Sequence, residues 1–241
     1  MFGRPVADAL VAALDPRPED TVLELAAGTG EVGRALVGRV DRLISSDLSP
    51  VMIEAARRRL PSVEHRVIDM HEIDLPDASV DGVVCRWGYM LVPDPALAVR
   101  ETRRVLRPGG RLAAAVWAAA ERNPWAALFG RSLVERGLME PPVPGAPSMF
   151  AFGDQARLDA LLREAFDDVR VEEVPLEFRV ETFGDYRRFM TNLGATLRET
   201  LAALDERTRS EVDVDARAAL EPFACDGGYV LPGVSLIATA S

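Results

Sequence analysis

Lysine is absent from this sequence of 241 residues, so all 28 basic residues are arginine. We interpret this bias as GC-rich coding, but it also excludes any chemistry that needs a lysine amine or its Schiff base. Cysteine is nearly absent as well, because the chain contains only Cys85 and Cys225. Two cysteines are too few for a disulfide framework or a cysteine metal site, which favours a reducing, cytoplasmic setting and no bound metal.

Positive charge and long apolar runs are also in short supply. The formal net charge is -10, which argues against a protein that follows the phosphates of a nucleic acid or binds an anionic membrane surface. No segment approaches the ~20 apolar residues that a membrane span requires. Residues 1–13 have no long apolar run of the kind found in a signal peptide, so we expect a cytoplasmic protein.

What the chain does contain favours one α/β domain. Hydrophobic residues make up 48% of the chain and charged residues 27%, which is enough apolar material for a sizeable core. After a helix over residues 4–14, short apolar strands alternate with amphipathic helices. We predict strands over 21–26, 43–46, 63–68, 80–85 and 111–117, and helices over 32–40, 50–60 and 96–106. This alternation predicts a parallel sheet with helices on both faces, a central first strand and a ligand at the carboxyl ends of the strands.

The second half of the chain follows a different pattern, because the alternation stops at about Ala118. Here we predict helices over 123–139, 154–165 and most of 182–220, and strands over 169–180 and 229–240. The expected fold is a mostly parallel sheet of seven strands whose last strand is antiparallel. We expect a single domain over 1–241, with a ligand-binding core over 20–117 and additional helical segments over about 118–225.

A glycine-rich loop follows the first predicted strand. Residues 28–33, Gly-Thr-Gly-Glu-Val-Gly, satisfy G-x-G-x-x-G. Glycines there allow a strand to turn sharply into a closely packed helix, or allow a ligand to reach the backbone amides. NAD-binding folds use the same device with an acid about 20 residues further on, where this chain has Asp47. The loop alone therefore leaves the cofactor open.

Four motifs together indicate which cofactor the loop binds. Glu24 begins E-x-A-x-G-x-G, Asp47 lies in Ser-Asp-Leu-Ser, Asp69-Met70 closes the third strand, and residues 104–110 read R-V-L-R-P-G-G. This set resembles class I S-adenosylmethionine (SAM) dependent methyltransferases, and within them the menaquinone/ubiquinone-biosynthesis-like (methyltransferase type 11) branch. The resemblance covers residues 20–117 and implies a Rossmann-like sheet with SAM as cofactor and S-adenosylhomocysteine as product.

The resemblance implies a role for each acid of the set. Glu24 orients the loop and contacts the methionine amino group through water, and Asp47 binds both ribose hydroxyls. Leu48 and Met52 match the apolar residues beside the adenine. The alternative for an acid at a strand end is to cap the next helix or turn, whereas an acid inside an apolar strand, such as Glu24, needs polar partners.

The remaining cofactor residues follow from the same resemblance. Ala26, Gly28 and Gly30 form the loop against the cofactor. Asp69 and Met70 match the pair whose carboxylate and backbone amide read the adenine edge. Arg86, at the end of the fourth strand, falls where the family lines the methionine part. The turn over residues 107–110 is expected to be structural.

Methyl transfer from SAM needs alignment and exclusion of water more than an acid-base apparatus, so a base matters only if the acceptor arrives protonated. His71 lies two residues after Asp69, and Tyr89 follows the fourth strand; these are the two candidate catalytic residues. The alternative for Tyr89 is core packing. His65 is expected on a strand surface.

The predicted function is methyl transfer from SAM to oxygen or carbon of a small acceptor such as a phenol, a quinol precursor or a natural-product-like metabolite. In such enzymes the segments after the fifth strand form a lid that selects the acceptor, and the aromatic residues of the C-terminal half form either its cage or ordinary core. The alternative is a SAM-binding protein that does not transfer methyl groups. Methylation of RNA or protein is disfavoured by the charge and by Cys-Arg-Trp-Gly at 85–88 in place of an N-P-P-Y-like motif. The sequence leaves a homodimer open.

Overall fold

The structure is a computed structural model that describes residues 3–143 and 145–241. The chain divides into two compact units. The first unit consists of Met1–Ala118, Gly145–Val174 and Ser235–Ser241, and the second of Ala119–Pro144 and Pro175–Val234. The first unit thus contains the predicted ligand-binding core together with two segments from the second half of the sequence.

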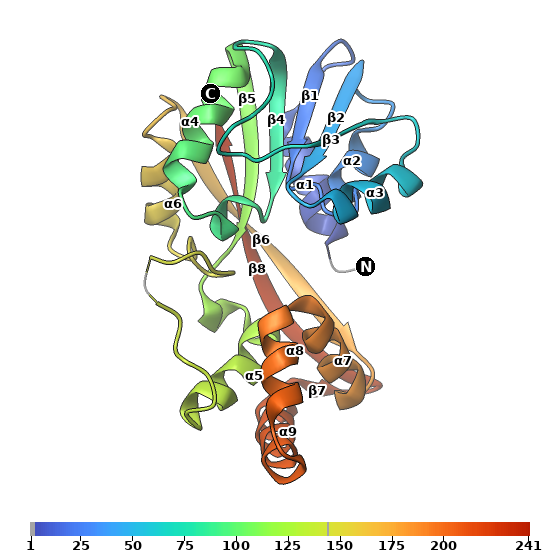
Figure 1. Ribbon diagram of the computed structural model, residues 1–241, viewed down its shortest axis with the longest axis vertical. Coiled ribbons are helices and arrows are strands. Elements are labelled where there is room, and N and C mark those ends of the chain that lie inside the picture. Colours follow the sequence, from blue (N-terminus) through green and yellow to red (C-terminus); the bar gives the residue numbers. More distant parts are fainter. Residues whose placement is uncertain (1–2, 144) are drawn as a thin grey trace. The chain divides into compact units, whose positions relative to one another are not determined.

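A sheet with the strand order β3-β2-β1-β4-β5-β8-β6 organises the chain, and β7 pairs with β8 beside it (Figure 1). The strands are β1 (Thr21–Leu25), β2 (Arg42–Asp47), β3 (Glu64–Val67), β4 (Val80–Arg86), β5 (Leu106–Trp117), β6 (Val169–Val180), β7 (Ala224–Cys225) and β8 (Gly228–Ala240). Strands β1 to β5 pair in parallel, and β8 runs antiparallel to β5. The α/β fold with a central first strand is therefore confirmed, while the two-residue strand β7 is an addition.

The helices of the first unit lie against this sheet. They are α1 (Arg4–Leu14), α2 (Glu31–Leu36), α3 (Pro50–Arg59), the 3₁₀ helix η1 (Tyr89–Leu91), α4 (Pro95–Val105) and α6 (Gln155–Leu162). Helix α1 contacts β4 and β5, α3 contacts β2 and β3, and α4 contacts β5 and α6 (Figure 1). Ser49 caps α3, since its hydroxyl accepts the N–H of Met52 at 3.4 Å, and Pro50 occupies the first turn.

The turn between α4 and β5 differs from the prediction of a strand that begins at residue 111. Strand β5 begins at Leu106, directly after the helix. Its register against β4 then shifts, because Val80 pairs with Leu106 while Gly82 pairs with Arg111. The residues between are absorbed as a bulge, which Gly109 permits with a φ of 77°. The R-P-G-G segment is therefore a structural irregularity inside a strand pair.

The second unit is helical around an aromatic core. Its helices are η2 (Ala120–Arg122), α5 (Pro124–Glu135), α7 (Phe183–Leu193), α8 (Ala195–Ala203), α9 (Glu206–Leu220) and η3 (Glu221–Phe223). Helix α5 contacts α9, and α7 contacts α8. The buried aromatic side chains of this unit are Trp125, Phe129, Phe178, Phe183 and Tyr186. They pack on one another, with Phe129 stacked on Tyr186 at 5.5 Å between ring centroids, so they are core and do not form an open cage.

No helix within the described part of the chain is long and apolar enough to cross a membrane.

Candidate cofactor site

Glu24 is the most deeply buried acid of the site. It lies near the end of β1 and is only 2% exposed. Both of its carboxylate oxygens have partners: Oε1 accepts the N–H of Gly33 at 2.9 Å, and Oε2 accepts the hydroxyl of Ser45 at 2.9 Å. Burial raises the pKa of Glu24 to about 7, although both hydrogen bonds act in the opposite direction. The carboxyl group therefore ties the glycine loop and α2 to the sheet.

Two serines of β2 complete this attachment. Ser45 binds the Glu24 side chain, and the hydroxyl of Ser46 donates to the Glu24 carbonyl oxygen at 2.7 Å. The carbonyl oxygen of Ser46 in turn accepts the N–H of Ala27 at 2.9 Å. The sequence analysis missed both residues, although two adjacent serines in a strand that is otherwise buried were a signal for a polar partner on a neighbouring strand.

The loop itself adopts left-handed backbone at three positions. The φ angles are 51° at Ala26, 56° at Gly28 and 81° at Gly30. Glycine adopts such angles without strain, whereas Ala26 is held there by its surroundings. A Cβ atom added at Gly28 would meet no atom within 4 Å, so the backbone of this residue faces open space that a ligand can approach.

Asp47, at the end of β2, binds the glycine loop directly. Its Oδ2 accepts the N–H of Gly28 at 2.8 Å, and its Oδ1 accepts the N–H of Ser49 at 2.9 Å. Asp47 thus caps the start of the next turn and also holds the glycine loop, while its contact with the ribose hydroxyls stays a prediction. Leu48 and Met52 follow it and are 64% and 41% exposed, which leaves their apolar surfaces free for contact beside Asp47.

Asp69 and Met70 lie just after β3. The N–H of Ile68 donates to the carbonyl oxygen of Asp47 at 3.1 Å, which brings the ends of β2 and β3 together. Hydrogen bonding from the backbone N–H of His71 lowers the pKa of Asp69. Met70 is buried, and its Cε lies 3.2 Å from the position of a Cβ added at Gly88.

Arg86 ends β4 and is stacked on an aromatic pair. Its guanidinium lies 4.5 Å from the ring centroid of Trp87, and Trp87 stacks on Trp117 at 4.2 Å. The guanidinium also donates to the carbonyl oxygen of Gly3 at 3.3 Å. Burial lowers the pKa of Arg86, while the charges of Glu31 and Glu24 oppose the change. The indole N–H of Trp87 donates to Ser235 at 3.1 Å within the same unit.

The structure places Tyr89 in the core, as its packing alternative predicts, and a catalytic role for its hydroxyl stays a prediction. The side chain is 1% exposed, and its hydroxyl lies 2.6 Å from that of Thr102. Because Thr102 donates to the carbonyl oxygen of Ala98, the tyrosine is the donor of the pair. Burial raises the pKa of Tyr89 well above its usual value. A phenol that is buried, neutral and already bonded matches the packing alternative.

His71 lies beside Asp69, and its role as a base stays a prediction. Its Nδ1 lies 2.8 Å from Oδ1 of Asp69, and its Nε2 lies 3.4 Å from the backbone nitrogen of Asp94. Both ring nitrogens therefore have a hydrogen-bond contact within the protein, and the side chain is 21% exposed. His65 donates to the carbonyl oxygen of Leu60 through Nε2 at 2.9 Å, and its Nδ1 is buried without a partner in the described residues.

Arg59 is a further residue of the site that the sequence analysis missed. From α3 it donates to the hydroxyl of Thr29 at 3.0 Å and to Glu31 at 3.4 Å, and so it holds the outer side of the glycine loop. Arg59 is the last of three consecutive arginines at the end of α3, and this pattern carries no sequence signal for such a role. Among the described residues there is no group of three or more histidine, cysteine or acidic side chains that could hold a metal ion.

Comparison with known proteins supports the motif analysis. Residues 23–114 match the family model described as a methyltransferase domain. Over 122 residues the chain is 34% identical to a demethylmenaquinone methyltransferase of Beutenbergia cavernae, in an alignment that covers 51% of this chain and 51% of the relative. The chain spans about half or less of the length of the curated relatives it matches, as shown by coverages of 32%, 51% and 46%.

Solved structures agree on the fold. The YcgJ protein of Bacillus subtilis has a TM-score of 0.66 at 16% identity and covers 97% of this chain and 96% of its own. The (4+2)-cyclase SpnF has a TM-score of 0.57 at 18% identity and covers 98% of this chain and 80% of its own. At these identities the likeness establishes the architecture alone. The match over residues 23–114 spans Glu24, Asp47 and Asp69, and this part of the chain is similar to a methyltransferase domain.

Proposed function

We propose that this chain transfers the methyl group of SAM to an oxygen or carbon atom of a small-molecule acceptor. The observation that carries this proposal is the arrangement around the glycine loop. A buried carboxyl group, Glu24, fixes the loop, Asp47 binds its Gly28, and the backbone at Gly28 faces open space. These features fit SAM, which presents an ammonium group, two ribose hydroxyls and an adenine to its protein.

The name of one relative and the charge support this acceptor class. The Beutenbergia cavernae relative is a demethylmenaquinone methyltransferase, which supports a quinol precursor among the proposed acceptors. The net charge of -10 supports a small molecule over a nucleic acid. A cytoplasmic location and a lid built from about residues 118–225 remain part of this proposal.

When bound, SAM supplies a methyl group on a sulfonium whose positive charge disappears during in-line transfer. The contribution of the chain is to align the reactants and to exclude water. Asp47 and the glycine loop hold the nucleoside part, and Arg86, fixed on Trp87, lines the methionine part. With Tyr89 buried and His71 bonded at both nitrogens, proximity provides most of the rate, and an acceptor that is already deprotonated or strongly nucleophilic is favoured.

The second candidate is a protein that binds SAM without transferring its methyl group. Its support is that the same architecture occurs in the (4+2)-cyclase SpnF, so the fold does not dictate methyl transfer. An acceptor panel separates the two candidates. Purified protein is incubated with SAM and with phenols, quinol precursors or bulk RNA, and S-adenosylhomocysteine is quantified by mass spectrometry. Product with a small acceptor supports transfer; SAM binding without product from any acceptor favours the second candidate, and product from RNA alone contradicts the acceptor class.

Asp47→Ala tests the cofactor site itself. Loss of a charge-assisted contact to the ribose hydroxyls should weaken SAM binding by roughly 1–3 kcal/mol. Asp226→Ala is the matched control, because it removes the same charge from an exposed residue of the second unit. Isothermal titration calorimetry gives both affinities, and an unchanged affinity for Asp47→Ala would remove this residue from the site.

A further inference from the structure

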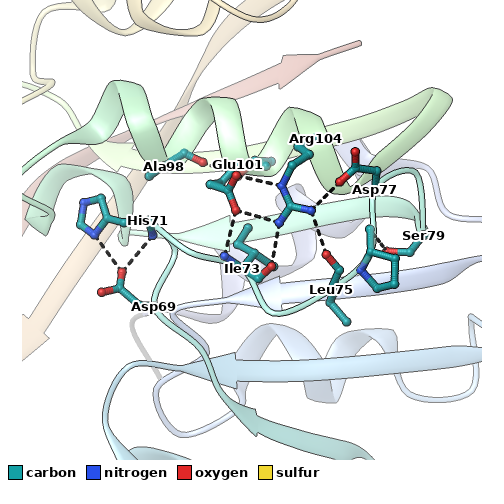
Figure 2. Close-up of polar contacts among 11 residues, drawn as sticks. Asp69, His71, Ile73, Leu75, Asp77, Ser79, Ala98, Glu101 and Arg104 are labelled. Carbon is teal, nitrogen blue, oxygen red and sulfur yellow. Dashed lines mark hydrogen bonds and ion pairs between the residues drawn. The ribbon is translucent and has the colours of Figure 1, made fainter.

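The carboxylate of Asp69 is held through only one of its two oxygens. Oδ1 accepts the backbone N–H of His71 at 2.9 Å and lies 2.8 Å from Nδ1 of the same residue. Oδ2 has no hydrogen-bond partner within residues 3–143 and 145–241, and the Asp69 side chain is 48% exposed. Figure 2 shows both contacts converging on one oxygen while the other points away. The protein therefore orients the Asp69 carboxylate, and Oδ2 remains available to accept a hydrogen bond.

His71 is itself oriented by α4. The N–H of Asp94, the N-cap residue of that helix, donates to Nε2 of His71 at 3.4 Å. A ring nitrogen that accepts carries no proton, so the network assigns the proton of the neutral imidazole to Nδ1, which donates to Asp69. The imidazole of His71 thus links the start of α4 to the carboxylate of Asp69.

The loop that follows is fastened to the same helix. Arg104 of α4 uses all five of its N–H groups (Figure 2). Two of them bind the carboxylate of Glu101 at 2.8 and 2.7 Å, one binds Asp77 at 2.8 Å, and two bind the carbonyl oxygens of Ile73 and Leu75 at 2.7 and 2.9 Å. Glu101 also accepts the N–H of Ile73 at 3.0 Å. This bidentate, fully saturated arrangement leaves the backbone after residue 72 little freedom.

We propose that His71 is a positioning residue that turns Asp69 so that its free oxygen accepts the exocyclic amine of the adenine ring. The inference rests on the proposed function, because it takes Asp69 as the adenine contact. An amine donates to a carboxylate, whereas the carbonyl oxygen that replaces it in hypoxanthine would meet the carboxylate as a second acceptor. A site built around a fixed acceptor discriminates between such ligands far better than one with a loose acceptor.

Calorimetric titration of S-adenosylhomocysteine and of S-inosylhomocysteine into the full chain tests the proposal. For His71→Ala we expect affinity for the adenosyl ligand to fall about 5- to 30-fold, as for the loss of one to two kcal/mol of charge-assisted bonding, with little change for the inosyl ligand. His71→Asn can still donate to Asp69 and should restore most of the adenosyl preference. Ser79→Ala is the matched control, because it removes a hydrogen bond to Pro76 in the same loop without touching Asp69.

The outcomes separate the proposal from its premise. If wild-type protein binds neither ligand, the proposed function fails and this inference with it. If wild type shows no adenosyl preference, or Asp69→Ala keeps it, the adenine contact is refuted. If Asp69→Ala loses the preference but His71→Ala keeps it, His71 is not a positioning residue. An equal loss of both ligands in His71→Ala indicates a general structural role and also overturns the inference.

Discussion

At the scale of single residues, Glu24 combines two unfavourable properties, burial and a charge, that the protein offsets only in part. Its pKa is raised from 4.5 to about 7 by burial. The folded protein therefore keeps a proton that the unfolded chain releases, and the free energy of unfolding falls as the pH rises from about 4.5 to about 7. Above about pH 7 the raised pKa lowers the free energy of unfolding by about 3 kcal/mol, compared with a glutamate whose pKa folding does not change.

Glu24→Gln should remove this pH dependence. The amide oxygen can still accept the N–H of Gly33, and the hydroxyl of Ser45 can rotate to accept the amide. We expect the variant to be more stable than wild type at pH 8 and similar to it at pH 4.5. Urea unfolding of the variant and of wild type at a series of pH values measures the difference between their free energies of unfolding. The contributions of the other acids cancel in this difference. A constant difference across the series would mean that folding leaves the pKa of Glu24 unchanged.

Tyr89→Phe tests the packing assignment of the other buried hydroxyl. Removing it leaves Thr102 as a buried acceptor without its donor, which should lower the free energy of unfolding by about 0.5–1.5 kcal/mol. SAM affinity and turnover should not change. Tyr186→Phe, which loses a bond to the Trp125 carbonyl oxygen in the second unit, is the comparison. Lower turnover at unchanged stability would return Tyr89 to the list of catalytic residues.

At the scale of elements, α2 is short and tightly placed because of what it packs against. A Cβ atom on Gly33 would lie 2.6 Å from Oε2 of Glu24 and 3.2 Å from Cδ1 of Leu60. The carboxylate cannot move away easily, since both its oxygens are bonded. Close packing of helix against strand thus depends on this glycine, independently of any ligand.

Two glycine-to-alanine changes in helices should have opposite signs. Gly33→Ala gains about 1 kcal/mol of helix propensity but loses about 1–3 kcal/mol through overpacking, so destabilisation is expected. Gly130→Ala in α5 places its Cβ 3.6 Å from Cε of Met139, an ordinary contact, and should stabilise by about 0.5–1 kcal/mol. Chemical denaturation of both variants checks the pair. Stabilisation by Gly33→Ala would show that Glu24 is free to move.

The elements also show how far the sequence can predict structure. Alternating patterns predicted the strands and most helices to within a few residues, because burial imposes the periodicity directly. The start of β5 was wrong by five residues, since the R-P-G-G segment has turn chemistry but pairs with β4 as a bulge. Helix α2 ends at Leu36, earlier than predicted, and Gly38 follows in left-handed backbone with a φ of 76°.

At the scale of the whole molecule, ligand binding should be visible as added stability. A ligand that binds only the folded state raises the free energy of unfolding by about 2.7 kcal/mol at 100 times its Kd. We expect SAM and S-adenosylhomocysteine to raise the melting temperature of the transition that includes residues 24–33, and NAD to leave it unchanged. Differential scanning calorimetry with each ligand measures the shifts. Stabilisation by NAD alone would contradict the SAM site.

The sequence by itself determined the α/β fold, the order of the early strands and the cofactor family, because these depend on periodicity and on motifs that are local in the chain. Only the tertiary structure showed which groups the side chains of Tyr89 and His71 contact. Their partners, Thr102 and Asp94, lie 13 and 23 residues away, and no local pattern announces such bonds. The partner of the two adjacent serines, Glu24, was likewise visible only in space, because β1 and β2 are adjacent in the sheet while a helix separates them in sequence.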